Sequence, residues 1–186
     1  MQGAIVENAC QLDVLIGKCL RKYAYVDQRN IARFAERFAH SCGLTAIPRN
    51  PFTLLPEQFG IRLSRTLLPR QIAAQWMLCD GIYVFEYSGH RQQHTLSIAL
   101  WHEFFEVISS HSCFPSRLST DVECKLGTLF AVNLLMPEQT LRAVAKEVGH
   151  PDQDKAAVLA GRFGVSTAAM RVRLKELELV YHERAR

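Results

Sequence analysis

The chain has 186 residues and a mass of 21.1 kDa, with 48% hydrophobic and 22% charged residues. This composition and a mean hydropathy of -0.02 exclude a disordered or collagen-like chain and predict one globular domain of ordinary size. The net charge of +4 is too small to indicate a dedicated nucleic-acid-binding protein.

The N-terminal part of the sequence predicts two amphipathic helices between Val6 and about Cys42. Apolar residues recur there at helical spacing, and Gly43 follows at a position typical of a helix end. The run from Pro48 to Pro51 then breaks regular structure. After it, we expect a short helical turn over 56–59 that ends at Gly60.

Three β-strands are predicted next. The segment from Ile61 to Leu68 alternates apolar and polar residues, and two runs with strand propensity follow, from Ala74 to Cys79 and from Ile82 to Tyr87. Asp80 and Gly81 join these two runs, and this dipeptide favours a tight hairpin turn. We therefore expect a small three-stranded antiparallel sheet.

The segment from about Thr95 to Ser109 is apolar nearly all the way round, which indicates a helix buried inside the domain. Its charged residues are unusual, because His102 and Glu106 lie about 40° apart on one face and Glu103 lies at the edge of that face. Burying such groups unpaired would cost several kcal/mol. They therefore require polar partners, a metal ion or a solvent-filled cleft.

The C-terminal part predicts further helices, which run from about Val122 to Met136, Glu138 to Val148, Asp152 to Phe163 and Thr167 to Leu179. The turn over 164–166 gives the last two helices the spacing of a helix-turn-helix. Four basic residues there could meet DNA phosphates: Arg162, Arg171, Arg173 and Lys175. Acidic residues follow at once, so contact with DNA is a weaker expectation than contact with protein.

The five residues from His102 to Glu106 read H-E-F-F-E and so differ from the zinc-binding motif H-E-x-x-H only at the last position. In that motif two histidines one helical turn apart bind zinc, and the glutamate takes a proton from the metal-bound water. A helical pair between His102 and Glu106, with Glu103 anchoring a neighbouring loop, explains the same residues without a metal. Both interpretations remain open from these residues alone.

The next predicted helix reads C-K-L-G-T-L-F-A-V-N-L-L-M-P from Cys124, and with the preceding His-Glu it resembles the ImmA/IrrE family of metallo-endopeptidases. In that family, a His-Glu-x-x-His helix is followed by approximately E-x-x-A-N-x-F-A-x-x-L-L-M-P. Phe130-Ala131 and the final L-L-M-P match in register. A downstream segment of the form L-A-x-x-F-x-V-S extends the resemblance, which covers roughly residues 48–180.

The resemblance implies a role for each residue that falls on a site position. His102 would be the first metal ligand, and Glu103 the general base that activates water. The second ligand, His in the family, is Glu106 here, and the third, normally Glu, falls on Cys124, with Glu123 one residue earlier. With Cys124 this set suits zinc, and with Glu123 it would favour manganese or iron.

The substituted ligands lead to two hypotheses for function. Two anionic ligands would weaken the Lewis acidity of the ion, so the first hypothesis is a weakened metal-dependent endopeptidase that cleaves a regulatory protein. The alternative is a degenerate peptidase fold that acts as a regulatory module and binds protein or DNA without catalysis. His90 and His94, just before the helix, remain possible substitutes for the missing histidine.

The expected fold class is α+β, with a helical core around the His102 helix, a small antiparallel sheet and a C-terminal segment resembling a helix-turn-helix. We expect three parts: N-terminal helices over 1–47, a metallopeptidase-like domain over 48–137, and the C-terminal segment over 138–186 packed on it. The six cysteines lack a C-x-x-C pair and are expected to be reduced. Because neither a membrane span nor a signal peptide is visible, we expect a cytoplasmic protein without membrane contact.

Overall fold

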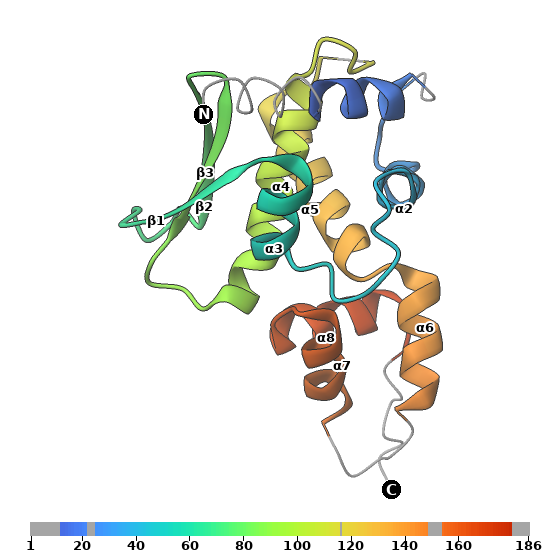
Figure 1. The fold of residues 1–186 in the computed structure, drawn as a ribbon. Coiled ribbons are helices and arrows are strands. Elements are labelled where there is room, and N and C mark those ends of the chain that lie inside the picture. The colour runs from blue at the N-terminus through green and yellow to red at the C-terminus, as the bar shows by residue number, and fades with distance from the viewer. Residues whose placement is uncertain (1–11, 22–24, 116, 149–153, 180–186) are drawn as a thin grey trace, which may run out of the picture.

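The computed structural model describes residues 12–21, 25–115, 117–148 and 154–179. It confirms the α+β class, with a small sheet at one side of a larger group of helices (Figure 1). The beginning of the first predicted helix at Val6 and the beginning of the predicted helix at Asp152 lie outside the described residues. Among the described helices, none is long and apolar enough to span a membrane.

Two N-terminal helices form as predicted, over residues 12–20 and, as α2, over Ile31–Ser41. The apolar stripe of α2 is buried and packs on α5. The rings of Phe34 and Phe38 each lie 5.8 Å from the ring of Phe130. The N-terminal helices therefore share a core with the helix that follows the His-Glu motif.

Helix α3 spans Pro51–Phe59 and is longer than the predicted turn. The sequence interpretation treated Pro51 as a breaker, but proline fits the first helical position, where its missing N–H leaves no bond unmade. The side chain of Asn50 caps this end by accepting a hydrogen bond of 3.1 Å from the amide of Phe52. Gly60 ends the helix in the left-handed conformation, at φ 64°.

The sheet contains β1 (Arg62–Thr66), β2 (Ala74–Cys79) and β3 (Ile82–Ser88) in the order β1-β3-β2. The predicted hairpin is confirmed, since β2 and β3 pair antiparallel through Asp80 and Gly81, which both have positive φ. The prediction of a wholly antiparallel sheet was wrong, because β1 pairs parallel to β3. The segment over 67–73 joins β1 to β2 and passes the end of β3, so that β1 and β2 lie on opposite sides of β3.

Helices α4 (Gln93–Ser110) and α5 (Thr120–Leu135) form the centre of the fold and pack against each other. The apolar surface of α4 is buried as predicted, with Trp101, Phe104 and Phe105 fully enclosed. The indole of Trp101 donates a hydrogen bond of 3.0 Å to the carbonyl of Arg49. This bond fixes the segment before α3 to the middle of α4.

The C-terminal part comprises α6 (Glu138–Glu147), α7 (Lys155–Phe163) and α8 (Thr167–Glu176). Gly164 ends α7 at φ 66°, and Ser166 caps α8 by accepting a hydrogen bond from the Ala169 amide. One continuous apolar core joins the N-terminal, central and C-terminal helices. The division into three parts remains a prediction, and the described residues of all three share this core.

Candidate functional site

Three side chains of the sequence motif lie together on the face of α4 that turns toward β2 and α5. Nε2 of His102 lies 3.3 Å from Oε1 of Glu106, one helical turn later. Their side chains keep 15% and 32% of their exposure, so the pair is only partly open to solvent. The second carboxylate oxygen of Glu106 accepts a hydrogen bond of 3.2 Å from the indole N–H of Trp76 in β2.

The other ring nitrogen of His102 faces α5. Nδ1 lies 3.2 Å from the hydroxyl oxygen of Thr128, and that hydroxyl donates its own proton to the carbonyl of Cys124 at 3.1 Å. The Thr128 oxygen is therefore left to accept from the ring, while Glu106 accepts at Nε2. A doubly protonated imidazole satisfies both contacts, and such a ring has no free electron pair for a metal ion.

Gly127 makes this close approach between His102 and α5 possible. A Cβ atom at this position would lie 3.2 Å from three atoms of the imidazole ring. Any side chain on Gly127 would therefore move the ring or the helix. The family resemblance places alanine here, so the glycine belongs to the local packing of the substituted site.

Glu103 faces β2 rather than a loop. The backbone amide of Trp76 donates a hydrogen bond to its carboxylate. The same tryptophan residue thus contacts both glutamates of the motif, Glu103 through its main chain and Glu106 through its side chain. Trp76 couples the candidate site to the strand at the edge of the sheet.

His102, Glu103 and Glu106 change one another's pKa values. Burial, followed by the nearby charge of Glu106, raises the pKa of Glu103 to about 7. The hydrogen bond to Glu106 raises the pKa of His102, against the smaller opposing effect of its own burial. The same bond is the main reason that the pKa of Glu106 is lowered. His102 and Glu106 therefore stabilise each other's charged forms, whereas Glu103 holds a proton more readily than an exposed glutamate.

The remaining predicted ligands lie on the first turns of α5. The Ser109 hydroxyl, at the end of α4, donates a hydrogen bond to the carboxylate of Glu123. Cys124 is exposed. Because contacts pair His102 with Thr128 and Ser109 with Glu123, the two helices run antiparallel and place Cys124 near the level of Glu106.

The donor set does not fit a three-ligand metal site as it is arranged. Among the residues that the structure describes, no group of three His, Cys, Asp or Glu side chains is positioned to hold a metal ion. His102 and Glu106 are near enough to act together, but Glu123 is directed to Ser109. His90 is exposed and lines a pocket with Arg70 and Arg91, and among the described residues it belongs to no group of three potential metal ligands. His94 is also exposed.

Sequence reasoning missed the partners that complete the site: Trp76, Ser109, Gly127 and Thr128. The indole of Trp76 reaches Glu106 from a strand 30 positions away in the chain. The family motif has Ala-Asn where this chain has Gly127 and Thr128. This difference was a sequence signal, because the chain also differs from the motif at the second and third ligand positions.

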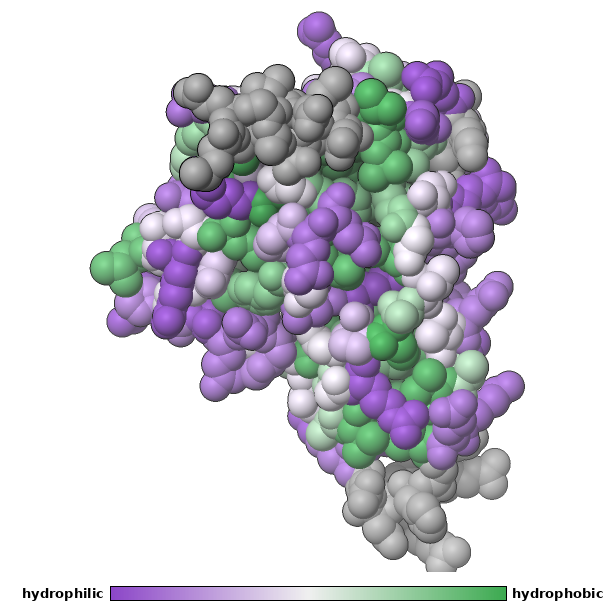
Figure 2. All heavy atoms as spheres, in the orientation of Figure 1, coloured by the Kyte–Doolittle hydropathy of each residue, from purple (hydrophilic) through white to green (hydrophobic). Residues whose placement is uncertain are grey.

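The basic residues of α7 and α8 are mostly engaged within the chain. Arg173 is 8% exposed and donates to the side chain of Asn133 at 2.8 Å. Arg162 pairs with Glu147 and Arg171 with Asp154. Figure 2 shows hydrophobic residues among hydrophilic ones in the lower part of the molecule, where Figure 1 places these helices. Acidic side chains therefore lie beside the exposed Arg162 and Arg171 on these helices.

Comparisons with known proteins confirm the resemblance to the ImmA/IrrE family. A peptidase-family model, described as the IrrE N-terminal-like domain, matches residues 125–175. The fold is similar to that of a Mycobacterium tuberculosis transcriptional regulator, with a TM-score of 0.55 and 16% sequence identity over 90% of this chain and 51% of the regulator. The chain thus spans about half the length of that regulator. No curated protein matches the sequence.

Proposed function

We propose that this chain is a degenerate ImmA/IrrE-type peptidase fold that acts as a regulatory module and binds a partner protein without cleaving it. The observation that carries the proposal is the pair of contacts made by His102, with Glu106 at one ring nitrogen and Thr128 at the other. A metal ion held by Nε2 and Glu106 would have to displace the proton that these two groups share. In the proposed role, these contacts form a polar network of the protein itself.

A partner protein is favoured over DNA because of the charges on α7 and α8. Arg162, Arg171 and Arg173 have acidic or amide partners within the chain. Arg173 is also buried, and the acidic side chains beside Arg162 and Arg171 would repel a phosphate backbone. The likeness of the fold to a transcriptional regulator supports a regulatory role.

Strand β2 is the proposed surface for the partner. It lies at one edge of the sheet, so an extended segment of another protein can add to it as a further strand. The amide of Trp76 points outward but already donates to Glu103. By the alternation of the strand the amide of Leu78 also points outward, and it is the group offered to a partner. The Leu78 side chain is 57% exposed, which leaves apolar surface for a partner.

A second candidate function is the weakened endopeptidase, and one observation favours it. Glu103 is partly buried beside His102, and its pKa of about 7 is that of a group able to accept and return a proton at neutral pH. Peptide hydrolysis by the family route needs a third ligand, which the arrangement around His102 and Glu106 does not supply. We therefore place this function second.

One experiment separates the two functions. A random decapeptide library is selected for binding to the purified protein in the presence of zinc, and the enriched peptides are then incubated with the protein and analysed by mass spectrometry. The proposal predicts bound, uncleaved peptides. It also predicts that Leu78→Pro, which removes an outward amide, weakens their binding at least tenfold, whereas Leu78→Ala does not.

Two results would contradict the proposal. Cleavage of the selected peptides that is lost in Glu103→Gln would identify a peptidase. Equal peptide binding by Leu78→Pro and Leu78→Ala, with both variants folded by circular dichroism, would show that β2 is not the binding edge.

A further inference from the structure

Two cysteines far from the His102 site lie in contact where the N-terminal helix meets the end of α2. Cys19 belongs to the helix over 12–20 and is 6% exposed, and Cys42 follows the last residue of α2. The thiol of Cys42 donates a hydrogen bond to the sulfur of Cys19. Cys19 belongs to the apolar core, and Cys42 packs against that core.

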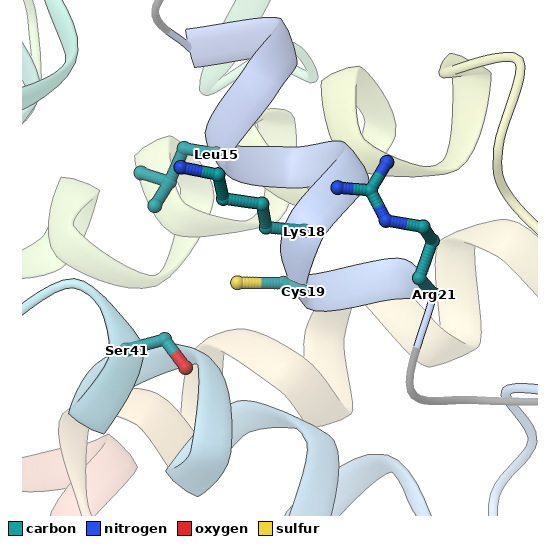
Figure 3. A pocket seen from close by; sticks show the side chains of 5 residues that line it. All are labelled: Leu15, Lys18, Cys19, Arg21 and Ser41. Atoms are coloured by element: carbon teal, nitrogen blue, oxygen red, sulfur yellow. The ribbon is translucent and has the colours of Figure 1, made fainter.

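A pocket gives access to Cys19. It has a volume of about 480 Å³, and five residues line it: Leu15, Lys18, Cys19, Arg21 and Ser41. Figure 3 shows the side chains of Lys18 and Cys19 on the same side of the N-terminal helix, with Ser41 at the end of α2 across the pocket. A small solute in the pocket can therefore reach Cys19, although little of that residue is exposed on the outer surface.

The pocket distinguishes the two sulfurs. Cys19 is one of its five lining residues, whereas Cys42 is not. The hydrogen bond to Cys19, burial and the negative charge of Cys19 all raise the pKa of Cys42. A small oxidant that enters the pocket therefore meets the sulfur of Cys19 first, with the Cys42 thiol in contact with it.

We infer that Cys19 and Cys42 form a peroxide-sensitive thiol pair, with Cys19 as the reacting sulfur and Cys42 as the resolving one. The Cys19 thiolate attacks one oxygen of hydrogen peroxide, so that an S–O bond forms, the O–O bond breaks and hydroxide leaves. Cys42 then attacks the Cys19 sulfur, forming the S–S bond and expelling the second oxygen. The two protons of the thiols complete two water molecules, and the peroxide takes the two electrons that the thiols lose.

The disulfide would fasten the N-terminal helix to α2. Because α2 packs on α5 through Phe34, Phe38 and Phe130, the link reaches the helix that carries Gly127 and Thr128. The inference does not depend on the proposed binding function, since both cysteines lie outside the His102 site.

The test begins with the reduced full-length protein and a few equivalents of hydrogen peroxide. The intact mass should fall by about 2 Da as two hydrogens are lost, and a thiol reductant should restore it. Peptide mapping should find Cys19 linked to Cys42. Closing this loop should raise the thermal midpoint of the oxidised protein by roughly 5–10 °C.

Three variants make the result specific. Cys42→Ser should block the cross-link and leave a sulfenic acid on Cys19, which dimedone traps. Cys42→Ala gives the same readout if the serine variant does not fold. Cys113→Ser is the matched control, because Cys113 is exposed and its sulfur lies near Gly17 of the same helix. This control should form the Cys19–Cys42 bond as the wild type does.

The inference is overturned by a cross-link from Cys19 to Cys113 in place of Cys42. It is also overturned if Cys19 stays reduced under conditions that oxidise the exposed Cys79 and Cys113.

Discussion

The helix pairs α4–α5 and α7–α8 both carry charged side chains, but those side chains lie in different surroundings. Between α4 and α5, His102, Glu103 and Glu106 are partly buried and shift one another's pKa values. On α7 and α8, Arg162 and Arg171 form ion pairs on the exposed surface. The difference shows that similar sequence signals, a charged face on a helix, can mark either a coupled polar network or a solvated surface.

Arg173 is the exception on α8, and its removal is expected to have the largest effect. Its guanidinium is buried and donates to the Asn133 side chain, the Met136 carbonyl and the Glu176 carboxylate. Arg173→Ala leaves buried acceptors without donors and should lower the free energy of unfolding by about 2–4 kcal/mol. Urea unfolding monitored by circular dichroism measures this change.

The matched control is Arg171→Ala, two positions earlier on the same helix. Arg171 pairs with Asp154 on the exposed surface, so its loss should leave stability unchanged within error. Equal losses for the two variants would contradict the contrast between buried and exposed arginines.

The next largest effect concerns pH. The folded pKa of Glu103, about 7, lies above its ordinary value of 4.5, so the folded state binds more protons between these values and stability falls as pH rises through them. The raised pKa of His102 acts in the same direction above pH 6.5. The lowered pKa of Glu106 changes the stability only below pH 4.5. We expect the protein to lose about 2 kcal/mol of stability between pH 5 and 8.

Glu103→Gln should remove most of this pH dependence, because the amide keeps the shape of the protonated carboxyl. The variant should match the wild type at pH 5 and exceed its stability at pH 8. Glu57→Gln, at an exposed carboxylate of α3, is the control and should keep the wild-type slope. Unfolding curves at several pH values measure all three proteins, and a wild-type slope in Glu103→Gln would refute the assignment.

The smallest changes in stability are expected when a glycine is replaced by alanine, once in each helix pair. Gly127→Ala would place a methyl group 3.2 Å from the ring of His102, which two polar contacts hold in place. We expect a loss of about 1 kcal/mol. Gly161→Ala in α7 meets nothing within 4 Å, so better helix propensity should add about 0.5–1 kcal/mol.

Thermal unfolding of both glycine variants shows whether each substitution stabilises or destabilises the protein. Destabilisation by Gly161→Ala, or stabilisation by Gly127→Ala, would break the distinction between the two helix pairs.

The elements that follow local rules could be predicted from the sequence. The hairpin at Asp80 and Gly81 requires positive φ at both residues, and this dipeptide provides it. The apolar surface of α4 identified a buried helix, and the spacing of His102 and Glu106 brought the two side chains together. In each case the deciding contacts lie within a few residues along the chain.

What could not be predicted depends on contacts between distant segments. The parallel pairing of β1 with β3 follows from how the chain crosses the sheet, which the alternation of residues does not encode. His102 contacts Thr128 of α5, and its partner Glu106 accepts from Trp76 of β2. The motif alone therefore left a metal ligand and a paired histidine as two open alternatives.

The central claim is that the polar network around His102 has replaced a metal site, and zinc binding tests it most directly. The wild type is compared by calorimetric titration with a double variant, Glu106→His and Cys124→Glu, which restores the ligand types of the family. The account predicts that the double variant binds one zinc ion roughly 100-fold more tightly than the wild type. Stoichiometric zinc binding of equal affinity by the wild type, lost in His102→Ala, would contradict the account.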